Sequence, residues 1–143
     1  MIDPINEMLI EHKCQKLILL YGKLNDLGDW AGLAETFTED ATFTRPTAPD
    51  EIIKGRQKIL ESFKSRPKTH TQHIISNIIV EVESEFEAHS TCTVQLYVGE
   101  ISSKHATAAH KLSQPVVGQY FDRFMIYNNK CYFTERRGRL TIK

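Results

Sequence analysis

Residues 21–43, YGKLNDLGDWAGLAETFTEDATF, contain the change from helix to strand that decides the fold. The run N-D-L-G at residues 25–28 is turn-forming and predicts the end of a helix. Asp29 is placed to cap a second, short helix, whose apolar stripe lies within residues 30–37. Residues 41–44 then resemble a brief strand. We therefore predict a helix, a tight turn, a short helix and a strand in succession.

The segments on either side of this stretch predict two further helical regions. Asp3 followed by Pro4 is typical of an N-cap with proline at the first helical position. Apolar residues then recur at spacings of four and three, which predicts a long amphipathic first helix. These residues are Ile10, Cys14, Leu17, Tyr21 and Leu24. After a loop marked by Pro46 and Pro49, Ile59, Leu60 and Phe63 predict a third helix that ends before Pro67.

From His70 onward the chain is rich in β-branched and aromatic residues, which predicts strands near 70–82, 87–98, 115–127 and 131–142. Asn128 and Asn129 favour a type I′ hairpin between the last two strands, so the sheet should be mostly antiparallel. The polar segment 102–115 is longer than a hairpin requires, and we expect either a mobile lid or an extended strand end. Helices followed by a meander of strands indicate an α+β fold.

Composition narrows the classes of function. The 143 residues suit one domain, 1–143, and 18 Lys and Arg balance 18 Asp and Glu. Without an excess of positive charge, we expect no binding to nucleic acid or to a membrane surface. The three cysteines, Cys14, Cys92 and Cys131, have no C-x-x-C spacing, which favours reduced thiols in the cytoplasm and excludes a zinc site built from cysteine.

Five short motifs occur along the chain in a fixed order. They are D-W-x-x-L at 29–33, F-x-x-D-A-x-F at 37–43, Gly55 with Ile59 and Phe63, T-Q-H at 71–73 with Asn77, and G-x-Y-x-D at 118–122. In this order they resemble SnoaL-like proteins of the nuclear-transport-factor-2-like superfamily. The resemblance implies a cone-shaped, cystatin-like roll in which three helices lie against a curved sheet and enclose a small-molecule pocket. Because this superfamily has many functions, the fold alone leaves the activity open.

At the pocket, the chain resembles scytalone dehydratase, bile-acid 7α-dehydratase and hexachlorocyclohexane dehydrochlorinase. These enzymes use an aspartate at the end of the first helix and a histidine on the strand after the third helix. The resemblance places these roles on Asp26 and His73, and the bile-acid enzyme adds a tyrosine that corresponds to Tyr21. The extra histidine and tyrosines of scytalone dehydratase have no counterparts here. Ketosteroid isomerase has its general base where this chain has Arg45, which disfavours that mechanism.

The chemistry of these residue types fits an elimination. Imidazole titrates near neutral pH, so His73 could take a proton next to a carbonyl group, and a carboxylate could hold its tautomer. Strand alternation puts His73 on one face with Ile75, Asn77 and Ile79. The alternative is a buried histidine that only forms a core hydrogen bond, and Asp26 could equally be a turn residue. We predict catalytic roles for Asp26, His73 and Tyr21; the predicted substrate-binding residues are Trp30, Asn77 and Tyr120.

Other clusters of polar residues predict no cofactor. Several histidines could suggest a metal, but no H-x-x-x-H helix or compact ligand group supports one. These histidines are His70, His73, His105 and His110. Three arginines crowd the last strand, where alternation sends Arg137 and Arg139 to one face and Arg136 to the other. We expect them to be solvated or paired with Asp122 or Glu135.

The sequence therefore favours a cofactor-independent, dehydratase-like lyase for a small, largely apolar cyclic or polyketide-like substrate. The main alternative is a binding domain, or a structural subunit resembling the β chain of ring-hydroxylating dioxygenases. A polyketide hydroxylase or cyclase is a third reading. The convex face of the sheet should also need cover, and we predict a homodimer through it. The residues expected on that face are Val94, Leu96, Phe121 and Tyr127.

Overall fold

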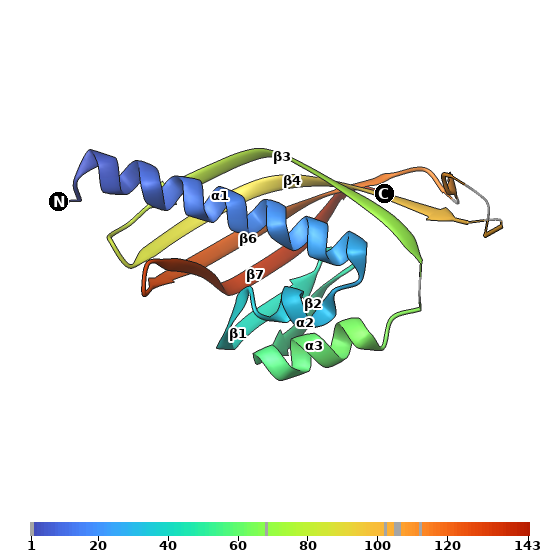
Figure 1. The fold of residues 1–143 in the computed structure, drawn as a ribbon, viewed down its shortest axis with the longest axis horizontal. Helices are drawn as coiled ribbons and strands as arrows, with labels where there is room; N and C mark the ends of the chain where they lie inside the picture. The colour runs from blue at the N-terminus through green and yellow to red at the C-terminus, as the bar shows by residue number, and fades with distance from the viewer. Residues whose placement is uncertain (1, 68, 102, 105–106, 112) are drawn as a thin grey trace.

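The computed structural model describes residues 2–67, 69–101, 103–104, 107–111 and 113–143. Figure 1 shows a long helix lying over a twisted, curved sheet, with the short helices near the C-terminal end of the long helix. The helices are α1 (Pro4–Leu27), α2 (Trp30–Ala34) and α3 (Arg56–Lys64). The strands are β1 (Phe37–Arg45), β2 (Ala48–Lys54), β3 (His70–Val82), β4 (Glu87–Glu100), β5 (His110–Lys111), β6 (Val116–Tyr127) and β7 (Lys130–Ile142).

The helix ends follow the predicted capping residues. The side chain of Asp3 accepts a hydrogen bond from the Ile5 amide, and Pro4 occupies the first turn of α1. Gly28 ends α1 in the left-handed conformation, with φ of 72°, and its amide donates back to the last turn. Asp29 caps α2 by accepting from the Gly32 amide at 2.9 Å. Within the described residues, none of the helices is both long and apolar enough to cross a lipid bilayer.

The sheet has the order β2-β1-β7-β6-β4-β3, with β5 paired to β4. All strand pairs are antiparallel except β1 with β7, which are parallel. Asn128 and Asn129 both have positive φ angles, as the predicted tight hairpin between β6 and β7 requires. The predicted α+β fold, with helices against a curved, mostly antiparallel sheet, is confirmed.

Two segments differ from the sequence prediction. The region of Pro46 and Pro49, expected as a loop, is a tight turn followed by the edge strand β2. Proline is compatible with an edge strand because no second neighbour needs its missing N–H group. In the segment 102–115, β5 pairs with β4, which indicates a strand extension. The alternative expectation, a mobile lid, includes residues 102, 105, 106 and 112, which lie outside the described residues.

A bulge in β3 corrects the predicted inner face of this strand. Asn77 has φ of 50°, and the pairing register with β4 shifts between Ser76 and Ile79. His73 and Ile75 face the helices as expected, but beyond the bulge Ile78 is partly buried while Asn77 and Ile79 are exposed. The prediction that Asn77 and Ile79 share the face of His73 is therefore wrong.

The residues predicted for the convex face lie on both faces of β4 and β6 rather than on one. Phe121 and Tyr127 are exposed on the outer face, as predicted. Val94 is buried and, together with Leu96, lines an internal cavity, so the prediction that these two residues cover the convex face is wrong. The inner face instead carries the core, which is centred on aromatic rings. These rings belong to Tyr21, Phe37, Phe43, Phe63, Tyr120, Phe124 and Phe133.

Candidate active site

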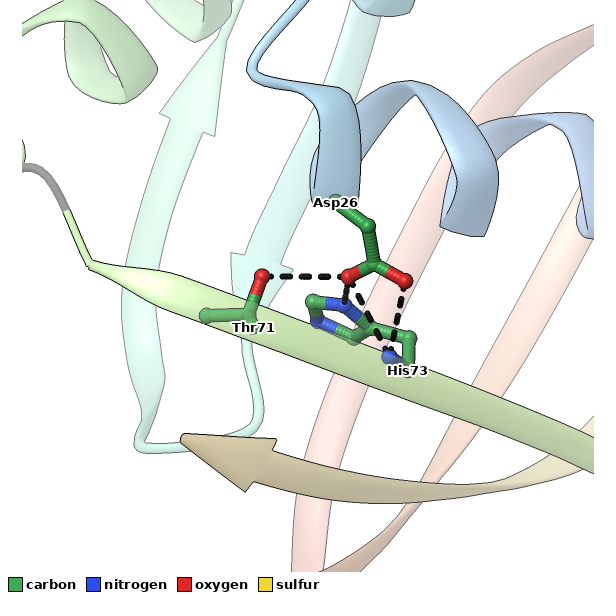
Figure 2. Close-up of polar contacts among 3 residues, drawn as sticks. All are labelled: Asp26, Thr71 and His73. Atoms are coloured by element: carbon green, nitrogen blue, oxygen red, sulfur yellow. Dashed lines mark hydrogen bonds and ion pairs between the residues drawn. The ribbon is translucent and has the colours of Figure 1, made fainter. Parts of the chain in front are cut away.

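Asp26 and His73 meet where the last turn of α1 crosses β3 (Figure 2). The Asp26 Oδ1 atom lies 2.5 Å from Nδ1 of His73. Both side chains are largely withdrawn from solvent, with 9% of His73 and 18% of Asp26 exposed. The structure thus brings together the two residues that the sequence analysis paired.

Three donors on β3 hold the Asp26 carboxylate in place. Besides the His73 ring, Thr71 donates its hydroxyl to Oδ1 at 3.0 Å, and the His73 backbone amide donates to Oδ2 at 2.9 Å. An ionised carboxylate can only accept, so Nδ1 of His73 carries the proton in this contact when the ring is neutral. Nε2 then has the free lone pair, and no described residue forms a hydrogen bond with it. In this tautomer Nε2 can accept a proton, and the Asp26 carboxylate lies where it can stabilise an imidazolium.

Ile75 of β3 packs against α1 at Gly22, one turn before Asp26. A Cβ atom on Gly22 would lie 2.7 Å from Cδ1 of Ile75 and 3.9 Å from Cβ of His73. The first distance is shorter than van der Waals contact, so a side chain at residue 22 would require the end of the Ile75 side chain to move. Gly22 therefore leaves the space that Ile75 occupies beneath α1.

Gly22→Val is accordingly expected to displace the Ile75 side chain and to destabilise the protein by about 1–3 kcal/mol through overpacking. Lys23→Val is the matched control, because Lys23 is exposed and the same β-branched residue enters the same helical turn. Urea unfolding of both variants measures the difference. Equal losses of unfolding free energy in the two variants would show that Gly22 has no packing role.

His73 opens onto an internal cavity of about 80 Å³ between the end of α1 and the inner face of the sheet. Its apolar wall includes Val94, Leu96, Val116 and Leu140. Its polar lining includes Tyr21, Asn25, Arg45, Arg66, His73 and Tyr120. A wider cavity of about 760 Å³ adjoins it, shares Asn25 and Arg66, and contains Asp26 and Trp30. The two cavities therefore adjoin near the end of α1.

Tyr21 shares the inner cavity with His73, whereas Asp26 approaches His73 from the wider one. The Tyr21 ring is buried among aromatic rings, and its hydroxyl has no hydrogen-bond partner among the described residues. Burial raises the pKa of Tyr21 well above its ordinary value, and Tyr120 raises it further. Tyr21 therefore stays protonated at neutral pH and can donate to a ligand oxygen.

Beneath these tyrosines, Arg136 forms a fully buried ion pair with Asp122. Nε of Arg136 lies 3.0 Å from Oδ1 of Asp122, and 0% of either side chain is exposed. The guanidinium lies 3.7 Å from the ring centroid of Tyr120 and 4.2 Å from that of Tyr21. The sequence analysis placed Arg136 on the opposite face of the last strand from its two arginine neighbours and allowed for pairing with Asp122, as is found. Its position against the two tyrosines that line the cavity was not predicted.

Burial has opposite effects on the two members of this pair. It raises the pKa of Asp122 to about 6, against the opposing effect of Arg136. Burial also acts to lower the pKa of Arg136, but Asp122, Cys92 and the two tyrosines together shift it upward. Arg136 is consequently a permanent positive charge behind the Tyr21 and Tyr120 rings.

The remaining predicted residues fall into two groups. Tyr120 lines the inner cavity, and Trp30 lines the wider cavity and stacks on Phe63 with ring centroids 5.3 Å apart. Asn77 is exposed and lines neither cavity, because the bulge turns it outward. Among the described residues no group of three His, Cys, Asp or Glu side chains could hold a metal ion. His105 lies outside the described residues.

Comparison with known proteins assigns the family. A model of the SnoaL-like domain matches residues 6–137. The chain belongs to the SnoaL-like family. This SnoaL-like chain has no match among the curated proteins compared with it. The family match spans both the helices and the sheet, including Asp26 and His73.

Solved structures share the fold of this SnoaL-like chain at low sequence identity. A scytalone dehydratase candidate from Novosphingobium aromaticivorans has a TM-score of 0.81 at 20% identity, covering 98% of this chain and 89% of that one. A hexachlorocyclohexane dehydrochlorinase from Novosphingobium barchaimii has a TM-score of 0.79 at 16% identity, covering 97% and 91%. A candidate calcium/calmodulin-dependent protein kinase II association domain from Xanthomonas campestris has a TM-score of 0.73 at 12% identity, covering 90% and 85%.

Proposed function

We propose that this SnoaL-like protein is a cofactor-independent lyase of the dehydratase type, which acts on a small, largely apolar cyclic or polyketide-like substrate. The observation that carries the proposal is the Asp26 and His73 pair, whose imidazole opens onto a cavity that Tyr21 also lines. The Tyr21 hydroxyl has no hydrogen-bond partner among the described residues. The neighbours described as a dehydratase and a dehydrochlorinase support an elimination of this kind.

In the proposed reaction, Nε2 of His73 takes a proton from the carbon next to a carbonyl group. Asp26 stabilises the resulting imidazolium, and the Tyr21 hydroxyl donates to the oxygen on which negative charge develops. The electron pair of the broken C–H bond then forms the C=C bond as the β-hydroxyl group leaves. His73 returns the proton to this group, so the products are water and a conjugated carbonyl compound.

A panel of substrates tests the proposed function. It contains β-hydroxy carbonyl compounds together with halogenated and hydroxylated ring compounds, and ultraviolet absorbance reports the conjugated double bond. We expect the wild-type protein to convert at least one member faster than buffer does. If members bind but none is converted, the alternative of a small-ligand-binding domain or structural subunit is favoured, which the likeness to a kinase association domain supports.

The exposed outer face of the sheet supports a second proposal, a homodimer. Phe121 and Tyr127 are exposed there with Ile74 and Met125, and 62% of Tyr127 is accessible. We expect sedimentation equilibrium to give the mass of a dimer at micromolar concentration, and Phe121→Glu to give that of a monomer. Lys23→Glu is the control, because Lys23 is exposed on α1, which covers the opposite face of the sheet. A monomeric wild type at this concentration would contradict the dimer.

The proposed setting is the cytoplasm, without cofactor or nucleic acid. The three cysteines are buried and free, which fits a reducing compartment. The balanced charge offers no field that would attract a polyanion.

A further inference from the structure

Two arginines of the inner cavity have no role in the proposed proton transfer. Arg45, at the end of β1, and Arg66, just after α3, both line the cavity with His73. Their guanidinium carbons lie 5.5 Å and 4.4 Å from the centroid of the same Phe63 ring. Residues 21 positions apart in the sequence thus direct positive charge at one end of a small, largely apolar cavity.

Neither arginine has an acidic partner among the described residues. No Asp or Glu oxygen lies within 4.0 Å of either guanidinium there. The six residues outside the description are Met1, Lys68, Ser102, His105, Ala106 and Leu112, so none of them carries a side-chain carboxylate. In the part of the chain that the structure describes, no Asp or Glu lines the inner cavity. These two charges therefore differ from Arg136, which is neutralised by Asp122.

The hydrogen bonds of the pair leave donors available to a ligand. Arg45 donates from Nη2 to the Ser62 carbonyl at 2.7 Å, while its buried Nε has no partner in the described structure. The Arg66 side chain forms no hydrogen bond with the described residues and borders both cavities. Burial lowers the pKa of Arg66, and the charge of Arg45 lowers it further. Two like charges in a partly desolvated site are unfavourable unless an anion compensates them.

We propose that the inner cavity binds substrates that carry a carboxylate, and that Arg45 and Arg66 hold this group while His73 acts on a carbon atom elsewhere in the same molecule. This inference rests on the proposed function, because it names the substrate class of the same site. The planar, forked donors of arginine match a carboxylate, and the apolar wall of Val94, Leu96 and Val116 suits the ring or chain that carries it. The carboxylate serves as an anchor and is unchanged by the reaction.

Calorimetric titration of the full-length chain with benzoate, benzamide and inorganic phosphate tests the anchor. Benzamide has nearly the shape of benzoate without its charge. We expect benzoate to bind at least about tenfold more tightly than benzamide, since charge-assisted hydrogen bonds are stronger than neutral ones. Trp30, the single tryptophan, stacks on the Phe63 ring that both arginines approach, so a fluorescence change on benzoate binding reports a ligand close to this ring.

Substitutions connect the preference to the two arginines. Arg66→Gln is expected to abolish the preference for benzoate over benzamide. It should not unfold the protein, because the Arg66 side chain forms no hydrogen bond with a described residue. Arg45→Gln is expected to weaken the same preference. Arg123→Gln removes the same charge from an exposed arginine on β6 and should leave the preference intact. Equal binding of benzoate and benzamide, no binding of either at millimolar concentration, or a preference that survives Arg66→Gln would overturn the proposal. Binding of phosphate but not benzoate would overturn the assignment to a carboxylate.

The titration requires no turnover, so the two proposals fail separately. If the protein prefers benzoate to benzamide but converts no substrate, the proposed lyase activity is refuted and the proposed carboxylate site stands. A protein that converts neutral substrates and shows no preference for benzoate refutes the carboxylate anchor and leaves the lyase.

Discussion

His73→Ala is expected to lower kcat/KM for an accepted substrate by about 10²- to 10⁴-fold, the usual contribution of one general acid-base group. The variant loses the base at Nε2, while the carboxylate of Asp26 keeps its hydrogen bonds to the Thr71 hydroxyl and the residue 73 amide. The fold should therefore remain intact. Initial rates of double-bond formation, measured below saturation, give the ratio directly.

His89→Ala is the matched control for this loss. His89 lies on β4, is exposed and pairs with Glu83, away from both cavities. The kcat/KM of His89→Ala should equal that of the wild type, and the thermal unfolding of His89→Ala and His73→Ala should be similar. A wild-type rate in His73→Ala would show that another group removes the proton.

The largest effect on stability is expected for Arg136→Met, which should lower the free energy of unfolding by about 3–5 kcal/mol, as is usual when one member of a buried ion pair is removed. The variant leaves Asp122 buried without its counter-ion and removes the cation between the Tyr21 and Tyr120 rings. Arg137→Met is the control, because the neighbouring Arg137 is exposed and should change stability by less than about 0.5 kcal/mol. Urea unfolding measures both.

The pH dependence of the unfolding free energy identifies why Arg136→Met loses stability. Burial already raises the pKa of Asp122 to about 6, and removal of Arg136 should raise it further. A carboxyl group with a raised pKa in the folded state contributes stability below its unfolded pKa, and this contribution is lost as the pH rises through the folded pKa. The deficit of Arg136→Met should consequently be smaller near pH 5 than near pH 8. A deficit independent of pH would indicate that packing, rather than the unpaired carboxylate, is responsible.

The sequence predicted those parts of the fold that depend on local chemistry. Asp3, Pro4 and Gly28 set the ends of α1, and the two asparagines at 128–129 specify the β6–β7 hairpin. Strand β2 was missed because Pro49 is a loop residue by composition and is tolerated only because β2 lies at the sheet edge. The outward turn of Asn77 was missed because simple alternation cannot locate a bulge.

The site was predictable only in part, for a similar reason. Asp26 and His73 were paired through the family resemblance, since 47 residues separate them and no periodicity connects them. The positions of Arg45 and Arg66 beside Phe63, and of Arg136 beside Tyr120, depend on tertiary packing between distant segments. Alternation assigns a residue to a face but does not show whether that face meets solvent, a carboxylate or an open cavity.

Comparison of kcat/KM for the wild type, Asp26→Asn, His73→Ala and the double variant tests most directly whether Asp26 and His73 act as one unit. Asp26→Asn presents an amide that cannot stabilise the imidazolium, so its loss should be comparable to that of His73→Ala. Because residues that act together fail together, the double variant should be no slower than His73→Ala by more than a few-fold. Losses that multiply in the double variant, or wild-type rates in both single variants, would contradict the proposed mechanism.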